Sequence, residues 1–167
     1  MITQNRPDDK GCIRALRRLL ATQPSKRRSA RIRSVGTIMK IDLHCHTLYS
    51  NDNFLRPEVL IRRATELGLD GVCITEHYSI DASLPVEELE IPKNFKIFRA
   101  LEISTDAGHL LAYGLRDDGW NRWGLKYNLP LREVIDVIHE LGGICVPAHP
   151  YRAWDGIDEP LLETLAI

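Results

Sequence analysis

Segments typical of β-strands alternate with segments typical of helices from residue 39 onward, and this alternation constrains the fold more than any other feature. Strands are predicted at residues 40–46, 71–75, 95–103, 109–115 and 144–148. Helices with one apolar side are predicted at 57–67 and 131–141, each followed by a glycine. Strands that alternate with helices are typical of an α/β fold, so we expect a sheet of about five parallel strands.

The chain length limits how far such a sheet can close. A chain of 167 residues, 44% of them apolar, can bury one sizeable core. A complete β/α barrel normally needs roughly 200 residues or more, and five strands do not close a barrel of seven or eight. We therefore expect either an open sheet or the N-terminal part of a barrel domain, covering residues 39–167.

The charge distribution separates residues 1–38 from the rest. These residues hold ten Lys or Arg against two Asp, whereas residues 39–167 hold 12 basic and 21 acidic residues. One interpretation is a basic tail that binds nucleic acid or another anionic surface. The other is a disordered or non-native extension, with Met39 as the native start. The lack of interleaved aromatic residues favours the second interpretation.

Cysteine spacing and hydropathy bear on the compartment. The four cysteines, at positions 12, 45, 73 and 145, form no CxxC pair, as is usual for reduced thiols in the cytosol. Cys73 and Cys145 lie in apolar runs and are expected to be core residues. The longest apolar runs are too short to cross a bilayer. We expect a cytoplasmic protein without membrane contact, and the oligomeric state stays open.

Three polar residues alternate with apolar ones in the first predicted strand. Asp42, His44 and His46 are spaced by two, with Leu43 and Cys45 between them. Because side chains alternate across a strand, the three polar groups are expected on one face, where they suit a cation. The alternative is a pair of hydrogen-bonded surface histidines. The spacing within an otherwise apolar strand favours a metal site.

Further candidate ligands lie beside the ends of the other predicted strands. His77 follows the second strand, Glu102 ends the third, His109 begins the fourth and His149 follows the fifth. Each alone is a weak signal, but together they place five of the six histidines beside strand termini. His139 is the exception, because it lies on the polar side of the second predicted helix and is expected to be solvated.

Four motifs in series carry a family resemblance. They are DLHCHTLYS at 42–50, ITEH at 74–77, LEIS at 101–104 with GHLL at 108–111, and PAHPYR at 147–152. In order and spacing they resemble the PHP (polymerase and histidinol phosphatase) superfamily. The resemblance implies a distorted (β/α)7-type barrel, incomplete in this chain, that holds two or three divalent metal ions and hydrolyses phosphoesters.

The resemblance also implies a ligand set. His44 and His46 would bind one metal ion, and Glu102 would bridge it to a second ion that His109 and His149 also bind. A bridging carboxylate suits two cations about 3.5 to 4 Å apart, which share anionic charge and activate a water. Mixed imidazole and carboxylate ligands favour zinc, manganese or iron over magnesium.

Two positions depart from the family pattern. The family places an acid or a histidine at the fifth position after His46, where this chain has Asn51, and Asp52 is the neighbouring acid. His77 would serve a third metal ion. The late Asp-x-His motif of the family has no counterpart, because no histidine follows His149. We therefore expect a chain that lacks the last strands of the barrel.

Two further residues are candidates for catalysis. Asp42 is expected to orient a histidine rather than bind metal. Arg152 is expected either to hold a substrate phosphate in a fork of hydrogen bonds or to be a surface arginine. The expected activity is hydrolysis of a small phosphate monoester or nucleotide by metal-activated water. The acidic charge of residues 39–167 disfavours long nucleic acids, and a non-catalytic metal- or phosphate-binding module or inactive fragment is the alternative.

Overall fold

The computed structural model describes residues 38–162. The basic segment and Cys12 lie outside this range, so the interpretations of both stay predictions. The elements in chain order are β1 (Ile41–Cys45), α2 (Pro57–Glu66), β2 (Gly71–His77), the 3-10 helix η1 (Asp81–Glu88), β3 (Lys96–Thr105), β4 (Gly108–Tyr113), the 3-10 helix η2 (Asp118–Trp120), α3 (Leu131–Glu140), β5 (Ile144–Pro147) and α4 (Glu159–Leu162). Every predicted strand and helix is present, with small differences at the ends.

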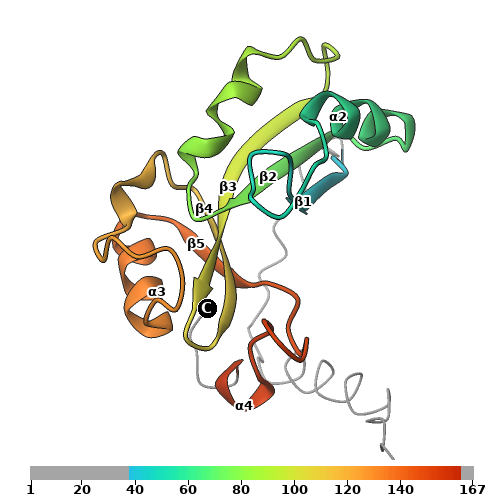
Figure 1. Cartoon of the computed structure of the whole chain (residues 1–167). Coiled ribbons are helices and arrows are strands. Elements are labelled where there is room, and N and C mark those ends of the chain that lie inside the picture. Colours follow the sequence, from blue (N-terminus) through green and yellow to red (C-terminus); the bar gives the residue numbers. More distant parts are fainter. Residues whose placement is uncertain (1–37, 163–167) are drawn as a thin grey trace, which may run out of the picture. The chain divides into compact units, whose positions relative to one another are not determined.

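The five strands form one sheet in the order β1-β2-β3-β4-β5 (Figure 1). β1, β2 and β3 are parallel, β4 is antiparallel to β3, and β5 is antiparallel to β4. The prediction that all five strands are parallel is therefore wrong for β4. Only two residues separate β3 from β4, and a parallel neighbour would need a crossover of a dozen or more. The short connection forces a hairpin.

The sheet curls into part of a barrel, as the predicted fold class requires. Tyr113 on β4 donates a hydrogen bond from its hydroxyl to the carbonyl oxygen of Leu43 on β1, at 2.9 Å. These residues belong to strands with two others between them, so the contact reaches across the concave face of the sheet. The fold is α/β, with a five-stranded half-barrel consistent with an incomplete PHP-type barrel.

Both helices α2 and α3 pack on one face of the sheet. Val72 and Ile74 of β2 pack with Ile61 and Ala64 of α2. Leu101 and Ile103 of β3 lie on the same face by register and pack with Val134 and Ile138 of α3. Since side chains alternate along a strand, residues 73, 75 and 77 of β2 and 100, 102 and 104 of β3 face the opposite way. The helix-free face is therefore where His77 and Glu102 lie.

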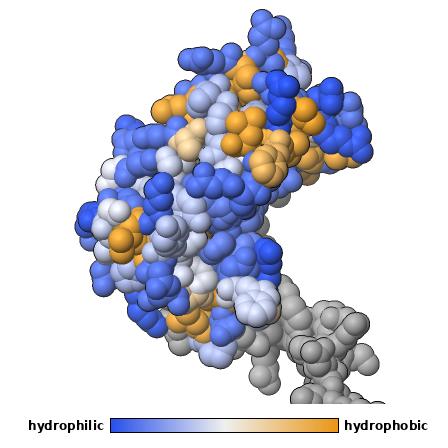
Figure 2. All heavy atoms as spheres, viewed as in Figure 1, coloured by the Kyte–Doolittle hydropathy of each residue, from blue (hydrophilic) through white to orange (hydrophobic). Residues whose placement is uncertain are grey.

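Cysteines of the sheet are buried, and one face of the surface is mostly polar. Cys73 and Cys145 are each 2% exposed, as predicted for core residues. Polar side chains predominate on the face drawn in Figure 2, and the apolar ones gather most densely around α2. Among residues 38–162, each helix is too short or too polar to cross a membrane.

Candidate metal centre

Glu102 lies at the middle of the site. Its side chain projects from β3 on the helix-free face, between the core residues Leu101 and Ile103, and it is 1% exposed. In the parallel pairing of β2 with β3, His77 is its direct partner. The alternation of core and site residues along β3 therefore fixes where this carboxylate points.

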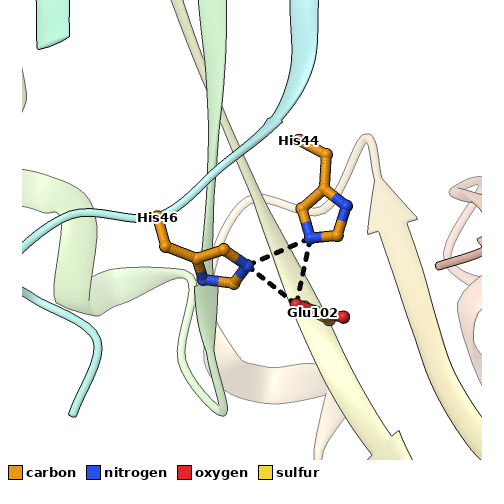
Figure 3. A group of neighbouring side chains, drawn as sticks. All are labelled: His44, His46 and Glu102. Carbon is orange, nitrogen blue, oxygen red and sulfur yellow. Dashed lines mark hydrogen bonds and ion pairs between the residues drawn. The ribbon is translucent and has the colours of Figure 1, made fainter. Parts of the chain in front are cut away.

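Five imidazole rings surround this one carboxylate. Three Nε2 atoms approach Oε2, at 2.8 Å (His46), 3.0 Å (His44) and 3.7 Å (His77). Nδ1 of His109 lies 3.0 Å from Oε1, and Nε2 of His149 lies 2.9 Å from it. Figure 3 shows how the rings of His44 and His46 converge on Glu102. All six residues predicted as metal ligands are thus brought to one place.

The direction of β4 is what brings His109 to this site. His44, His77 and Glu102 lie near the carboxyl ends of parallel strands, whereas His109 begins its strand. The beginning of a parallel strand would lie at the opposite rim of the sheet. Because β4 is antiparallel, its beginning meets the ends of its neighbours, and His109 pairs with Ser104 next to Glu102.

The spacing of the nitrogen and oxygen atoms fits divalent ions. Nε2 of His44 and Nε2 of His46 are 3.0 Å apart, and both also contact Glu102. Two ligands of a tetrahedral zinc ion are separated by about 3.3 Å, given bonds of about 2.0 to 2.1 Å. Among residues 38–162, four groups of three residues have ligand atoms within 4.8 Å of one another, and two of these groups contain Glu102. The donor set fits the predicted kind of ion.

Burial and the histidines set the charge of the site. Burial would raise the pKa of Glu102, but hydrogen bonds from His109, His44 and His46 outweigh it and hold that pKa well below its usual range. Burial lowers the pKa of His46, yet its hydrogen bond to Glu102 prevails and the pKa is raised. For His77, burial dominates and lowers the pKa. Glu102 is therefore the anionic centre of the cluster.

Two carboxylates extend the cluster at its rim. Oδ2 of Asp52 lies 3.3 Å from Nε2 of His77, so the acid beside Asn51 does reach this histidine. Asp155 was missed by sequence reasoning: its Oδ1 lies 3.5 Å from Nδ1 of His149, and its backbone oxygen accepts a hydrogen bond from the His109 amide. A loop aspartate six residues beyond a histidine has no periodic signal that would identify it.

Asp42 lies away from the cluster. In the pairing of β1 with β2, Asp42 lies opposite Val72 and Cys45 opposite Ile74, so β1 has one extra residue between them. Val72 and Ile74 share the helix-covered face, and Asp42 therefore faces that side together with Cys45. The prediction that Asp42 shares a face with His44 and His46 is wrong because of this bulge. Its carboxylate accepts a hydrogen bond from the His44 backbone N–H at 3.2 Å.

Arg152 lies at the edge of the cluster. It lines a pocket of about 330 Å³ together with the five histidines, Glu102, Asp52 and Asp155. Its side chain is 61% exposed, and its Nε lies 3.2 Å from Oδ1 of Asp155. His139, by contrast, is exposed on α3 and takes no part in the cluster, as predicted.

Comparison with known proteins agrees with this geometry. The sequence model of the PHP domain matches residues 42–160, which contain every residue of the cluster. The chain belongs to the PHP domain family. An uncharacterized protein of Methanocaldococcus jannaschii is 29% identical over 123 residues, which cover 68% of each chain. PHP domains form a superfamily of metal-dependent phosphoesterases, and this PHP domain has histidine and carboxylate groups that could hold metal ions.

Proposed function

We propose that this PHP domain is a metal-dependent hydrolase that cleaves phosphoester bonds in a small phosphate monoester or nucleotide. One observation carries the proposal: five imidazole nitrogens, from residues in or just after four strands, lie 2.8 to 3.7 Å from the two oxygens of a single buried carboxylate. Five uncharged imidazoles around one carboxylate add little to the stability of the fold by themselves. Divalent ions bound between the imidazoles and the carboxylate would explain why these side chains are grouped.

The residues divide naturally among two or three divalent ions. In the proposal, His44 and His46 hold one ion, Glu102 bridges, and His109 and His149 hold the second. His77 and Asp52 would hold a third ion, since Nε2 of His77 lies 3.3 Å from Oδ2 of Asp52. The ligands are mostly imidazole nitrogens, which favours zinc, manganese or iron over magnesium.

The bound ions would supply Lewis-acid activation of a water molecule and neutralise charge on the phosphoryl oxygens. The protein side chains orient the substrate around them. Arg152, at the pocket rim, offers a fork of N–H donors to a phosphate oxygen pair, and Asp155 holds that guanidinium in place at 3.2 Å. The pocket of about 330 Å³ suits a small phosphoryl group with a modest leaving group.

Side chains near the site that are nucleophiles in other hydrolases are engaged elsewhere. Cys45 is buried on the helix-covered face, and burial together with Asp42 raises its pKa to about 12. Ser50 is 4% exposed, and its hydroxyl donates to the carboxylate of Glu76. Neither residue lines the pocket that contains Glu102. This supports attack by water rather than by a protein side chain.

Metal analysis and turnover together test the proposal. The purified chain, stripped with EDTA and reloaded with zinc, manganese or iron(II), is assayed on p-nitrophenyl phosphate and its bis-ester. We expect two or three ions per chain and metal-dependent release of p-nitrophenol. Bound metal without turnover of these or a panel of nucleotides would favour a non-catalytic binding module, and absence of both would refute the proposal.

A further inference from the structure

Glu76 is a buried carboxylate that the proposed reaction does not use. It is 0% exposed and lies on β2 next to Thr75 and His77, but its side chain faces the helix-covered side with Val72 and Ile74. Among the described residues it forms no ion pair, although a buried charge without a cation is costly. A group kept at such a cost calls for a function.

Within residues 38–162, the hydrogen-bond partners of Glu76 are uncharged donors on the segment that follows β1. The backbone N–H of Thr47 lies 3.1 Å from Oε1 and 3.3 Å from Oε2, and the Thr47 hydroxyl donates to Oε1 at 2.5 Å. The hydroxyl of Ser50 donates to Oε2. Glu76 therefore ties this segment to β2 and, because a carboxylate only accepts, it fixes the direction of each hydrogen bond.

The direction of the Ser50 hydrogen bond decides what His46 must do. A serine hydroxyl has one proton, which goes to Glu76, so its oxygen can only accept from its other neighbours. Those neighbours are the His77 backbone N–H at 3.0 Å and Nδ1 of His46 at 3.2 Å. A hydrogen bond from Nδ1 requires that Nδ1 carry a proton. Without a metal ion, Nε2 of His46 donates its own proton to Glu102, 2.8 Å away. When a metal ion displaces that proton, Nδ1 keeps its proton and the lone pair is presented on Nε2.

We infer that Glu76 is a positioning residue that acts through Ser50 to keep the proton of His46 on Nδ1 and so present Nε2 as a metal ligand. The inference rests on the proposed function only for the metal. Histidine ligands generally have a partner on their second nitrogen that fixes the tautomer. Here a serine stands between the carboxylate and the ring.

The substitution Glu76→Gln tests the inference with almost no change in shape. The Thr47 N–H and hydroxyl both donate toward Oε1, so the amide oxygen belongs there and the amide NH₂ faces Ser50. The NH₂ donates to Ser50, whose hydroxyl then turns to donate to Nδ1 of His46. The relay, meaning the two hydrogen bonds that join residue 76 to Ser50 and Ser50 to His46, then runs in the opposite direction. The proton of His46 is therefore driven to Nε2.

Nuclear magnetic resonance of the histidine nitrogens reads this out directly. We expect Nδ1 of His46 to be protonated in the unsubstituted protein, with and without zinc, with its signals assigned by their loss in His46→Ala. In Glu76→Gln we expect Nδ1 to lose its proton and zinc affinity, measured by calorimetry, to fall about 10- to 100-fold. The control Glu66→Gln removes an exposed glutamate of α2 and should change neither.

Ser50→Ala separates the relay from the packing of Glu76, which keeps its Thr47 hydrogen bonds. This variant should lose the hydrogen bond of the Nδ1 proton and weaken zinc binding. Because Glu76 acts through Ser50, adding Glu76→Gln to Ser50→Ala should cost little more zinc affinity. Additive losses would overturn the inference, as would an unprotonated Nδ1 in the unsubstituted protein.

If Glu76→Gln does not fold, Ser50→Ala alone must still remove the hydrogen-bonded Nδ1 proton. A hydrogen-bonded Nδ1 proton that persists in Ser50→Ala would overturn the inference.

The metal-free spectrum keeps this inference distinct from the proposed function. A protein that binds no metal but shows the protonated Nδ1, and loses it in Glu76→Gln, would refute the metal site and leave the relay intact. A protein that binds and turns over with an unprotonated Nδ1 would refute the relay alone.

Discussion

His77 and Glu102 stand directly opposite each other on the parallel strands β2 and β3, with Nε2 of His77 3.7 Å from Oε2 of Glu102. Each projects from a strand that also carries core residues, Ile74 on β2 and Leu101 on β3. The remaining histidines approach the same carboxylate from β1, β4 and the end of β5. A site built on strand ends is held in place by the sheet itself.

The substitution Glu102→Gln should remove the centre of the metal cluster. It keeps the shape but deletes the charge that the imidazoles and the proposed ions share. We expect loss of at least one bound ion by elemental analysis and a fall in kcat/KM of about 10³-fold or more, by analogy with the loss of a key electrostatic group. Thermal unfolding of the EDTA-treated protein serves as the folding control. Full metal content with normal turnover would contradict the assignment.

Single histidine substitutions should show that the ions occupy two separate sites. His44→Ala should lower the metal content by one ion while the His109 and His149 site keeps its own, and His149→Ala should do the reverse. The matched control is His139→Ala, which removes an exposed histidine of α3. Titration by calorimetry and elemental analysis counts the ions. Equal loss of all metal in both variants would show one shared site instead of two.

The cluster residues at strand ends could be predicted from the sequence because their positions follow from local pattern. His44, His77 and Glu102 each come at the end of an apolar run, and the ends of parallel strands meet at one rim. His109 lies in the cluster as expected, although its strand was predicted to run in the wrong direction. The two-residue connection after Thr105 contained the information that β4 turns back.

Features set by long-range pairing could not be predicted. The extra residue of β1 shows only in the register of β1 against β2, so the alternation rule placed Asp42 on the wrong face. Glu76 meets Ser50 across 26 residues, and Asp155 meets His149 through a loop with no periodicity. These contacts depend on how the sheet curls, which no local pattern records.

Gly108→Ala should weaken metal binding without touching a ligand. Gly108 has φ +124°, and a Cβ atom there would lie 2.8 Å from the backbone of Gly156. The loop that carries His149, Arg152 and Asp155 would have to move. Gly68→Ala is the control, because its φ of +74° is also positive but the added Cβ meets nothing within 4 Å. Both should lose about 1 kcal/mol or more of stability, and only Gly108→Ala should lose zinc affinity by calorimetry. Equal zinc affinity in the two variants would show that the loop position does not matter.

His46 should make the stability of the metal-free protein depend on pH. Its pKa in the folded protein is raised, since its hydrogen bond to Glu102 outweighs burial. A raised pKa stabilises the fold fully below the unfolded value of about 6.5, and this contribution is lost as the pH rises through the folded pKa. In urea unfolding with EDTA, the free-energy gap between the unsubstituted protein and His46→Gln should shrink from pH 6 to pH 8. A gap that stays constant or widens would contradict the ion pair.

Three cysteines of the domain should be inert to thiol reagents while the protein is folded. Burial raises the pKa of Cys45, Cys73 and Cys145 to about 12 each, so almost no thiolate exists at neutral pH. They are also 8%, 2% and 2% exposed, which blocks access. In a Cys12→Ser variant, Ellman's reagent at pH 8 should therefore label almost nothing until urea is added, and then three thiols. Only the thiolate attacks the reagent, so rapid labelling of one thiol without urea would show that its strand opens locally. Mass spectrometry would then identify the labelled cysteine and hence the strand that opens.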